Sequence, residues 1–167
     1  MILPIHSFLT DIFAERKPSS VLDLGAGEGL FSIYAASFEA HVTAVDLKPF
    51  PEYLHGHPLI KTINQDIGSW ISQNKQTFDC IIVRSVLHYF APEFVQTNLL
   101  PKLAESTIPG GVIYIGTMTP DESAGKFFHD PETIATAIAP LTLVSKDEVV
   151  TGDSGKKHIF YHLVFQK

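Results

Sequence analysis

The sequence predicts an α/β protein: a doubly wound, mostly parallel seven-stranded sheet with helices on both faces. Strand-like and helix-like stretches alternate along most of the 167 residues, which is the pattern of parallel strands joined by crossover helices. The run FDCIIV, at 78–83, is apolar apart from Asp79 and suits a strand that is covered on both faces. The last two β-like stretches, 141–150 and 158–166, flank a turn-forming segment and predict a C-terminal antiparallel hairpin. No repeat or linker divides the chain, so we expect residues 1–167 to form one domain.

The N-terminal half of the chain predicts three helices and three strands. Apolar residues at helical spacing between 4 and 15 predict the first helix, and we expect residues 1–17 to pack on the core of the domain. Pro49 and Pro51 predict a loop between the second and third strands. The other elements expected in this half are strands at 21–24, 41–45 and 59–63 and helices at 30–38 and 67–74.

The C-terminal half predicts two helices around a fifth strand, followed by the hairpin. The helix at 92–106 begins at a proline, a residue that is favoured in the first helical turn. Pro-Gly-Gly at 109–111 predicts a turn that leads into the fifth strand at 111–117. The polar stretch 119–130 predicts a loop, and the alanine-rich stretch 131–139 predicts a short helix.

Composition argues against several classes of protein. The net charge is −6 and the basic residues are scattered, so the sequence carries no clear signature of nucleic-acid binding. No run of about 18 apolar residues occurs, so we expect no membrane-spanning helix. The N-terminus has no basic start before its apolar residues, so we expect no signal peptide. The single cysteine, Cys80, leaves no internal disulfide, and these features together predict a cytoplasmic protein.

A glycine-rich turn in VLDLGAGEGL is the most informative stretch of the sequence. Its glycines recur at every second position, so bare backbone lies beside any ligand held between the strand and the next helix. The dinucleotide pattern G-x-G-x-x-G fails here because Leu30 stands at its third glycine, and no P-loop ending is present. The pattern Asp23-x-Gly25-x-Gly27-x-Gly29 instead resembles the first motif of class I S-adenosylmethionine-dependent methyltransferases.

Four later segments resemble the remaining motifs of this family in the same order. They are VTAVDL, NQDI, FDCIIVRSVLHYF and the PGG turn. The resemblance implies that Asp46 accepts hydrogen bonds from the ribose hydroxyls of S-adenosyl-L-methionine and that Leu47 covers one face of the adenine. It also implies that Asp66 accepts a hydrogen bond from the adenine amino group and that the backbone N–H of Ile67 faces a nitrogen of the adenine ring. Asp66 also fits an N-cap of the helix that follows it, and this alternative stays open.

The methionine end of the cofactor is expected at the glycine turn. Its carboxylate suits the N-terminus of the helix that begins at Leu30, where free N–H groups favour an anion. The resemblance implies that backbone carbonyls of the glycine turn and of Arg84 accept hydrogen bonds from the cofactor's ammonium group, with Asp23 nearby. A purely structural role of Asp23 stays open. The cofactor-binding residues expected in all are Asp23, Gly25, Ala26, Gly27, Gly29, Asp46, Leu47, Asp66, Ile67 and Arg84.

The methyl acceptor is less well marked. After the fourth strand the sequence reads RSVLHYF, without the Asn/Asp-Pro-Pro-Tyr/Phe motif of enzymes that act on nucleobase or glutamine amides, and it resembles small-molecule methyltransferases. The candidate catalytic or acceptor-side residues are His88, Tyr89 and His129, with Asp130 beside them, and structural roles for them stay open. A base is needed only if the acceptor must lose a proton. His55 and His57 lack matching ligands, so no metal is expected.

The sequence therefore predicts an enzyme that transfers a methyl group from S-adenosyl-L-methionine to a small molecule by in-line displacement and releases S-adenosyl-L-homocysteine. The alternative is a non-catalytic cofactor-binding or partner subunit with a methyltransferase fold. A nicotinamide-dependent oxidoreductase is disfavoured by Leu30. The acceptor atom stays open, as does the choice between a monomer and a homodimer.

Overall fold

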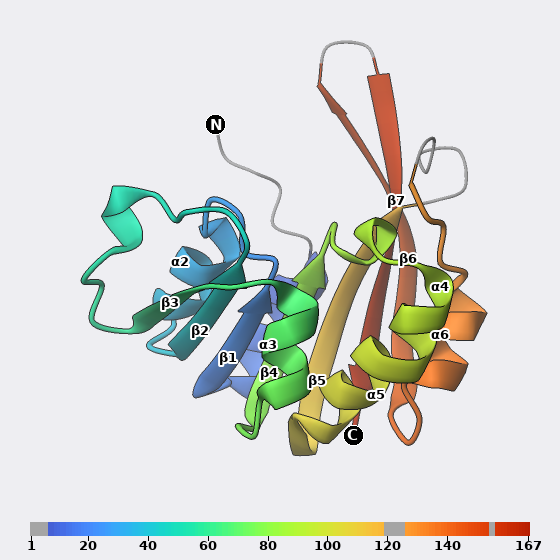
Figure 1. Cartoon of the computed structure of the whole chain (residues 1–167), viewed down its shortest axis with the longest axis horizontal. Coiled ribbons are helices and arrows are strands. Elements are labelled where there is room, and N and C mark those ends of the chain that lie inside the picture. The colour runs from blue at the N-terminus through green and yellow to red at the C-terminus, as the bar shows by residue number, and fades with distance from the viewer. Residues whose placement is uncertain (1–6, 119–125, 154–155) are drawn as a thin grey trace.

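The computed structural model describes residues 7–118, 126–153 and 156–167 and contains a single seven-stranded sheet (Figure 1). The strand order is β3-β2-β1-β4-β5-β7-β6; β1 to β5 run parallel, and β7 lies antiparallel to both β5 and β6. The predicted fold class is confirmed. The strands are β1 (Ser20–Leu24), β2 (His41–Asp46), β3 (Ile60–Asn64), β4 (Phe78–Arg84), β5 (Thr107–Met118), β6 (Thr142–Asp153) and β7 (Lys156–Gln166).

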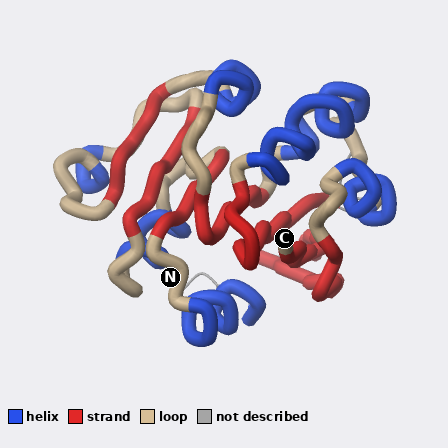
Figure 2. The backbone as a smooth tube through the Cα atoms, turned by 90° about the horizontal axis from the view of Figure 1, so that it is seen from below, coloured by secondary structure: helices blue, strands red, loops and turns tan. Residues whose placement is uncertain are grey.

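The helices cover both faces of this sheet (Figure 2). Among the described residues, no helix is long and apolar enough to cross a membrane. The α-helices are α1 (Ser7–Asp11), α2 (Leu30–Ala36), α3 (Ile67–Gln73), α4 (Pro92–Phe94), α5 (Leu100–Glu105) and α6 (Pro131–Ala137). Short 3-10 turns are η2 (Glu52–Leu54) and η3 (Leu87–Tyr89), and π-helical segments are η1 (Ile12–Arg16) and η4 (Val95–Leu99).

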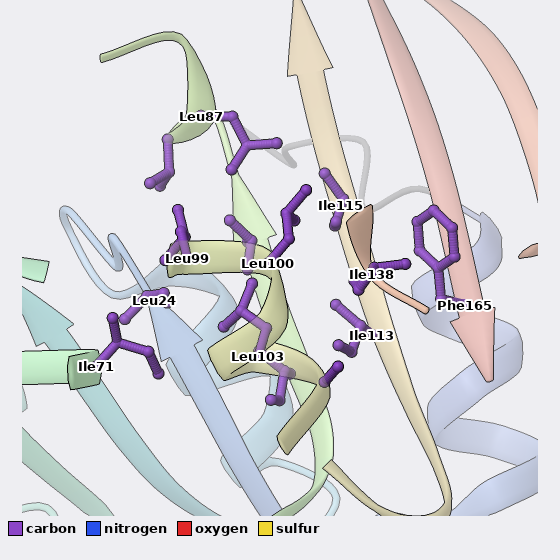
Figure 3. Packing of buried hydrophobic residues seen from close by; sticks show 14 of the residues in the cluster. Leu24, Ile71, Leu87, Leu99, Leu100, Leu103, Ile113, Ile115, Ile138 and Phe165 are labelled. Carbon is purple, nitrogen blue, oxygen red and sulfur yellow. The ribbon is translucent and has the colours of Figure 1, made fainter. Parts of the chain in front are cut away.

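Two apolar clusters hold the helices to the two faces. On one face, Ile71 of α3 and Leu103 of α5 pack with the strand residues Leu24 and Ile113 (Figure 3). On the other face, η1 contributes Phe13 to a second cluster that contains α2 and further strand residues. Neighbouring residues of one strand enter different clusters, because side chains alternate between the faces of a sheet. The described part of the N-terminal helix thus packs on the core.

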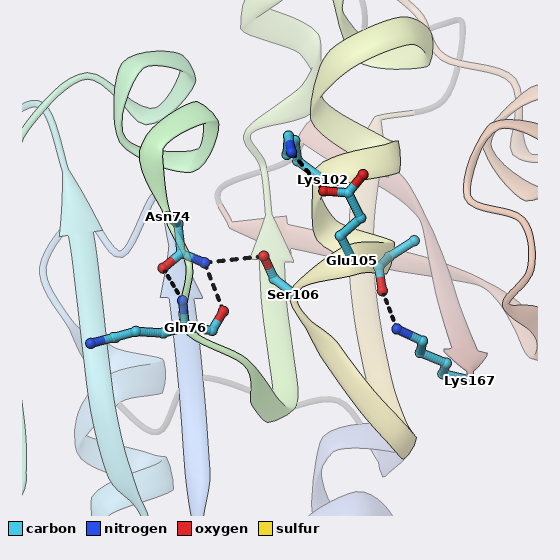
Figure 4. A network of polar contacts seen from close by, with 7 residues as sticks. Asn74, Gln76, Lys102, Glu105, Ser106 and Lys167 are labelled. Carbon is cyan, nitrogen blue, oxygen red and sulfur yellow. Dashed lines mark hydrogen bonds and ion pairs between the residues drawn. The ribbon is translucent and has the colours of Figure 1, made fainter.

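Polar contacts join the helix ends at the amino edge of the sheet (Figure 4). Asn74, which ends α3, donates from Nδ2 to the carbonyl of Gln76 and to Ser106 Oγ, at 2.9 and 3.1 Å. Lys167 donates from Nζ to the carbonyls of Ala104 and Thr107, at 2.9 and 2.7 Å. The three bonds to carbonyl groups satisfy backbone acceptors that the ends of helices and strands leave without partners.

Several element boundaries differ from the sequence predictions. The fifth strand begins at Thr107 rather than at 111, because Thr107 pairs with Phe78 before an irregularity at the glycines shifts the register. The helix predicted at 92–106 contains a π-helical segment just before Pro101, which lacks the N–H of a regular helical bond. The first residues of the predicted N-terminal helix, most of the loop after β5 and the centre of the hairpin turn lie outside the described residues.

Candidate active site

The candidate site lies where the strand order reverses, at the carboxyl ends of the neighbouring strands β1 and β4. Open α/β sheets bind ligands at such a switch point. A cavity of about 420 Å³ opens there, within the size range of small-ligand sites. A larger groove of about 600 Å³ lies at the opposite, amino edge of β2, β3 and β4, away from every residue predicted to bind the cofactor. We therefore take the cavity at the switch point as the site.

The cavity collects most of the residues that the sequence predicted for it. The predicted residues that line it are Gly25, Gly27, Asp46, Leu47, Asp66, Ile67, Arg84 and Tyr89. The predicted residues that do not line it are Asp23, Ala26, Gly29, His88 and His129. Four lining residues were missed, namely Lys48, Ser85, Val86 and Phe90. All four are close neighbours of predicted residues along the chain, and this proximity was the available signal.

Glycine is needed at the three positions of the turn for different structural reasons. All three have positive φ, a conformation that favours glycine. A Cβ on Gly25 would lie 2.2 Å from Val86 Cγ2, and one on Gly29 would lie 2.2 Å from Leu54 Cδ1, so these two glycines allow close packing. A Cβ on Gly27 would meet no atom within 4 Å. Because Gly27 lines the cavity, it is the glycine that leaves room for a ligand.

Asp46 is held in place by backbone donors. Its Oδ2 accepts from the N–H of Gly27 and its Oδ1 accepts from the N–H of Lys48, both at 2.8 Å. A carboxylate offers about four acceptor positions, so both oxygens can still accept from a ligand. The carboxylate at the end of β2 is therefore a rigid acceptor beside the glycine turn.

The start of α3 and Leu47 also line the cavity. Asp66 Oδ1 accepts from the N–H of Ser69 at 2.8 Å and caps the helix, which is the structural alternative left open by the sequence. Asp66 and Ile67 also line the cavity, so capping and ligand binding are compatible. Leu47 is 69% exposed, and an apolar side chain exposed at a cavity suits a flat apolar ligand.

Asp23 lies behind the glycine turn. It is 2% exposed and accepts a hydrogen bond from Ser32 Oγ of α2 at 2.6 Å. Burial raises the pKa of its carboxyl group from the usual 3.8 to about 6, with a smaller contribution from the charge of Asp46. The structure thus places Asp23 as a link between β1 and α2.

His88 and His129 are buried, with 2% and 4% of their surfaces exposed, and do not line the cavity. His129 Nε2 donates to the carbonyl of Phe90 at 3.1 Å, and the N–H of Phe127 donates to the carbonyl of His88 at 3.0 Å. Burial lowers the pKa of both rings, and that of His88 falls to about 4 with the added effects of Lys126 and His129. Both rings are therefore neutral at pH 7, and they fasten the end of the loop after β5 to η3.

The end of β4 bears a cation and a strained residue. The Arg84 guanidinium lies 5.3 Å from the centre of the Phe31 ring, in a cation–π contact. Ser85 has φ of +56°, in the left-handed region that a non-glycine residue rarely adopts. Its N–H donates to the carbonyl of Gly116 at 2.8 Å. Such strain is concentrated at functional sites.

The histidines considered for a metal do not form a site. Among the residues that the structure describes, no three His, Cys, Asp or Glu side chains cluster as metal ligands would. His57 Nδ1 accepts from the N–H of Leu59 at 3.2 Å and so stabilises its own loop.

Comparisons with known proteins agree with this geometry. A family model described as a methyltransferase domain matches residues 3–139, whereas no curated protein sequence matches the chain. N-methyltransferase NodS from Bradyrhizobium japonicum WM9, in complex with S-adenosyl-L-homocysteine, is similar in structure. Its TM-score is 0.78 at 21% identity, with 96% of this chain and 84% of that chain covered.

Two further solved structures are similar. One is the 1,6-didemethyltoxoflavin-N1-methyltransferase of Burkholderia thailandensis, with its named acceptor and S-adenosylhomocysteine bound (TM-score 0.76, 21% identity, 95% of this chain and 75% of that chain). The other is the magnesium protoporphyrin IX methyltransferase of Synechocystis PCC 6803 with bound SAM (TM-score 0.70, 17% identity, 94% and 76%). At these identities the likeness shows the fold, while the family model covers most of the chain. The resemblance predicted from the glycine turn is confirmed, and the chain belongs to the methyltransferase-domain family.

Proposed function

We propose that this protein transfers a methyl group from S-adenosyl-L-methionine to a small molecule. The observation that carries the proposal is the cavity at the switch point, where the glycine turn, Asp46 and the start of α3 meet. The structures of the similar methyltransferases support the choice of cofactor, because they contain this molecule or its demethylated product. The names of two of them contain the small molecules 1,6-didemethyltoxoflavin and magnesium protoporphyrin IX, which supports a small acceptor.

The lining residues suit the parts of this cofactor. We assign the ribose hydroxyls to Asp46, one adenine face to Leu47 and the adenine edge to Asp66 and the N–H of Ile67. The methionine part then lies over the glycine turn, towards the end of β4. When bound, the sulfonium supplies an activated methyl group. The acceptor's lone pair forms the new bond to the methyl carbon while the carbon–sulfur bond breaks, and that electron pair stays on sulfur.

The residues predicted as catalytic divide between two roles in this proposal. Tyr89 lines the cavity and is 65% exposed, so we assign it to the acceptor side. His88 and His129 do not line the cavity, so we assign them to positioning Tyr89 and Phe90. In-line transfer from a sulfonium depends mainly on alignment and on exclusion of water, so no general base is required of them.

Calorimetry with S-adenosyl-L-homocysteine tests the cofactor assignment. We expect saturable binding of this product at a single site and no competition by NAD⁺, because Leu30 breaks the dinucleotide pattern. No binding of S-adenosyl-L-homocysteine, or tighter binding of NAD⁺, would contradict the proposal.

Transfer from S-adenosyl-L-methionine with a labelled methyl group tests the second part of the proposal, which is that the acceptor is a small molecule. With a cellular extract of small molecules as acceptor, we expect the label in a small product. Label appearing only in added protein or nucleic acid would contradict a small acceptor. Cofactor binding with no transfer to any acceptor would favour a non-catalytic subunit.

Gly27→Ala is expected to reduce the space available to the ligand while the protein still folds. The added methyl group enters the cavity and should weaken S-adenosyl-L-homocysteine binding by at least about tenfold. The positive φ of +53° should lower the free energy of unfolding by about 1 kcal/mol. Gly110→Ala is the matched control, because Gly110 has φ of +79°, also has no atom within 4 Å of a Cβ, and does not line the cavity. Equal binding by the two variants would show that the cavity is not the cofactor site.

A further inference from the structure

We infer that the methyl acceptor carries an anionic oxygen group, such as a carboxylate, which binds at Lys126 beside Tyr89. This inference rests on the proposed function, since it concerns the acceptor side of the same cavity. It adds a substrate class and a binding residue that the glycine turn and the cofactor motifs do not address.

The carboxylates that line the cavity lie on one side of it. Asp46 and Asp66 lie at the ends of β2 and β3, where the cofactor is assigned, and the lining cation Lys48 follows β2 on the same side. At the end of β4 and in η3, the basic groups of the described residues are those of Arg84 and His88. Lys126 and His129 approach from the segment after β5. Among the described residues, the acceptor side therefore presents cations and neutral rings but no carboxylate at the cavity.

Lys126 lies against a residue that lines the cavity. It is exposed, and its Nζ lies 4.8 Å from the centre of the Tyr89 ring, which itself lines the cavity. Within the described part of the chain, no carboxylate forms an ion pair with Lys126. An exposed ammonium held over an aromatic ring keeps its charge available to a ligand.

His88 holds Lys126 in this position. Its Nε2 lies 3.4 Å from Lys126 Nζ, and an ammonium can only donate, so Nε2 accepts and the ring proton lies on Nδ1. The burial of His88 and the neighbouring ammonium both favour the neutral ring that this contact requires. His88 is thus a positioning residue that acts through Lys126.

An anionic acceptor fits this side better than a cationic or neutral one. Lys126 would repel a cation, and so would the sulfonium assigned to the neighbouring part of the cavity. An anion is attracted by both of these charges, and the exposed Tyr89 ring offers an apolar surface to the rest of a small acceptor. The charge thus orients the acceptor as well as attracting it.

The test compares benzoate, benzamide and benzylamine on protein saturated with S-adenosyl-L-homocysteine. These probes have similar shape and differ in charge. By ligand-observed NMR titration we expect benzoate to bind at least about fivefold more tightly than benzamide, and benzylamine more weakly still. Equal binding of the three, a preference for benzylamine, or no binding of benzoate would overturn the inference. Because saturation with S-adenosyl-L-homocysteine is measured first, failure of the proposed function is distinguished from failure of this inference.

Variants assign the effect to named side chains. Lys126→Gln should remove the preference for benzoate, whereas Lys102→Gln, which changes an exposed lysine paired with Glu105 on α5, should retain it. His88→Leu should weaken benzoate binding about as much as Lys126→Gln, measured on protein saturated with S-adenosyl-L-homocysteine. His88→Gln keeps an acceptor for the ammonium and should restore most of the preference. A full preference in Lys126→Gln would overturn the role of Lys126, and identical behaviour of the two His88 variants would overturn that of His88.

Discussion

Asp46→Asn is expected to raise the Kd for S-adenosyl-L-homocysteine by about 10- to 100-fold. Hydrogen bonds to a charged group contribute about 1.5–3 kcal/mol, and the ribose hydroxyls assigned to Asp46 would lose the ionised acceptor. The amide also disturbs the local geometry. The carboxylate now accepts from two backbone N–H groups, of Gly27 and Lys48, and an asparagine must turn its own NH₂ donors towards one of them. Isothermal titration of the folded variant measures the change.

Asp79→Asn is the matched control for Asp46→Asn. Asp79 Oδ2 also accepts from loop donors, with Ser19 N at 2.7 Å, Ser19 Oγ at 2.6 Å and Ser20 N at 3.0 Å. It lies at the amino edge of the sheet and does not line the cavity at the carboxyl ends. We expect this variant to lose about 1 kcal/mol or more of stability and to bind S-adenosyl-L-homocysteine normally. An unchanged Kd in Asp46→Asn, or equal losses of affinity in the two variants, would contradict the assignment of Asp46.

Most of the sheet could be predicted from the sequence because parallel strands leave a direct pattern. The run from Phe78 to Val83 is apolar except for Asp79, since both faces of β4 are covered, and the alternation of strands and helices specifies the crossovers. The start of β5 could not be predicted in this way. Thr107 joins the sheet only because it meets Phe78 across an irregular pair, and such pairing depends on two distant segments.

In the candidate site, too, some residues could be predicted from the sequence and others could not. Gly27 and Asp46 could be placed because the ends of neighbouring parallel strands meet at one edge of the sheet. Val86 and Phe90 were missed because their approach to the cavity depends on the 3-10 turn η3 and on the left-handed conformation of Ser85. His88 lies in the same turn but does not line the cavity. The direction of its side chain depends on the turn and could not be predicted from the polarity of the sequence.

The Asp23 carboxyl is expected to lower the stability of the parent protein by about 3 kcal/mol as the pH rises, and Asp23→Asn is expected to abolish this loss. The folded carboxyl keeps its proton up to a pKa of about 6, against 3.8 in the unfolded chain. Between these values the folded state binds more protons than the unfolded state, so stability falls as pH rises from about 4 to 6 and stays reduced above that. A shift of about two pKa units corresponds to about 3 kcal/mol. Urea unfolding at pH 4 and pH 7.5 should show the stability of the variant, relative to the parent protein, rising by most of this amount at the higher pH. A relative stability that does not depend on pH would contradict the cause.

The same carboxyl distinguishes a structural link from a part of the cofactor site. The resemblance places Asp23 near the cofactor's ammonium, whereas the structure places it behind the glycine turn, bonded to Ser32. If the ammonium stabilises the ionised carboxylate, ligand binding must lower the pKa of Asp23 and release a proton near pH 6. We expect this coupling, because a buried carboxylate is weakly screened from a charge across the turn. The affinity for S-adenosyl-L-homocysteine should then rise with pH through about 6 in the parent protein and not in Asp23→Asn. Parallel pH profiles would assign Asp23 to joining β1 and α2 alone.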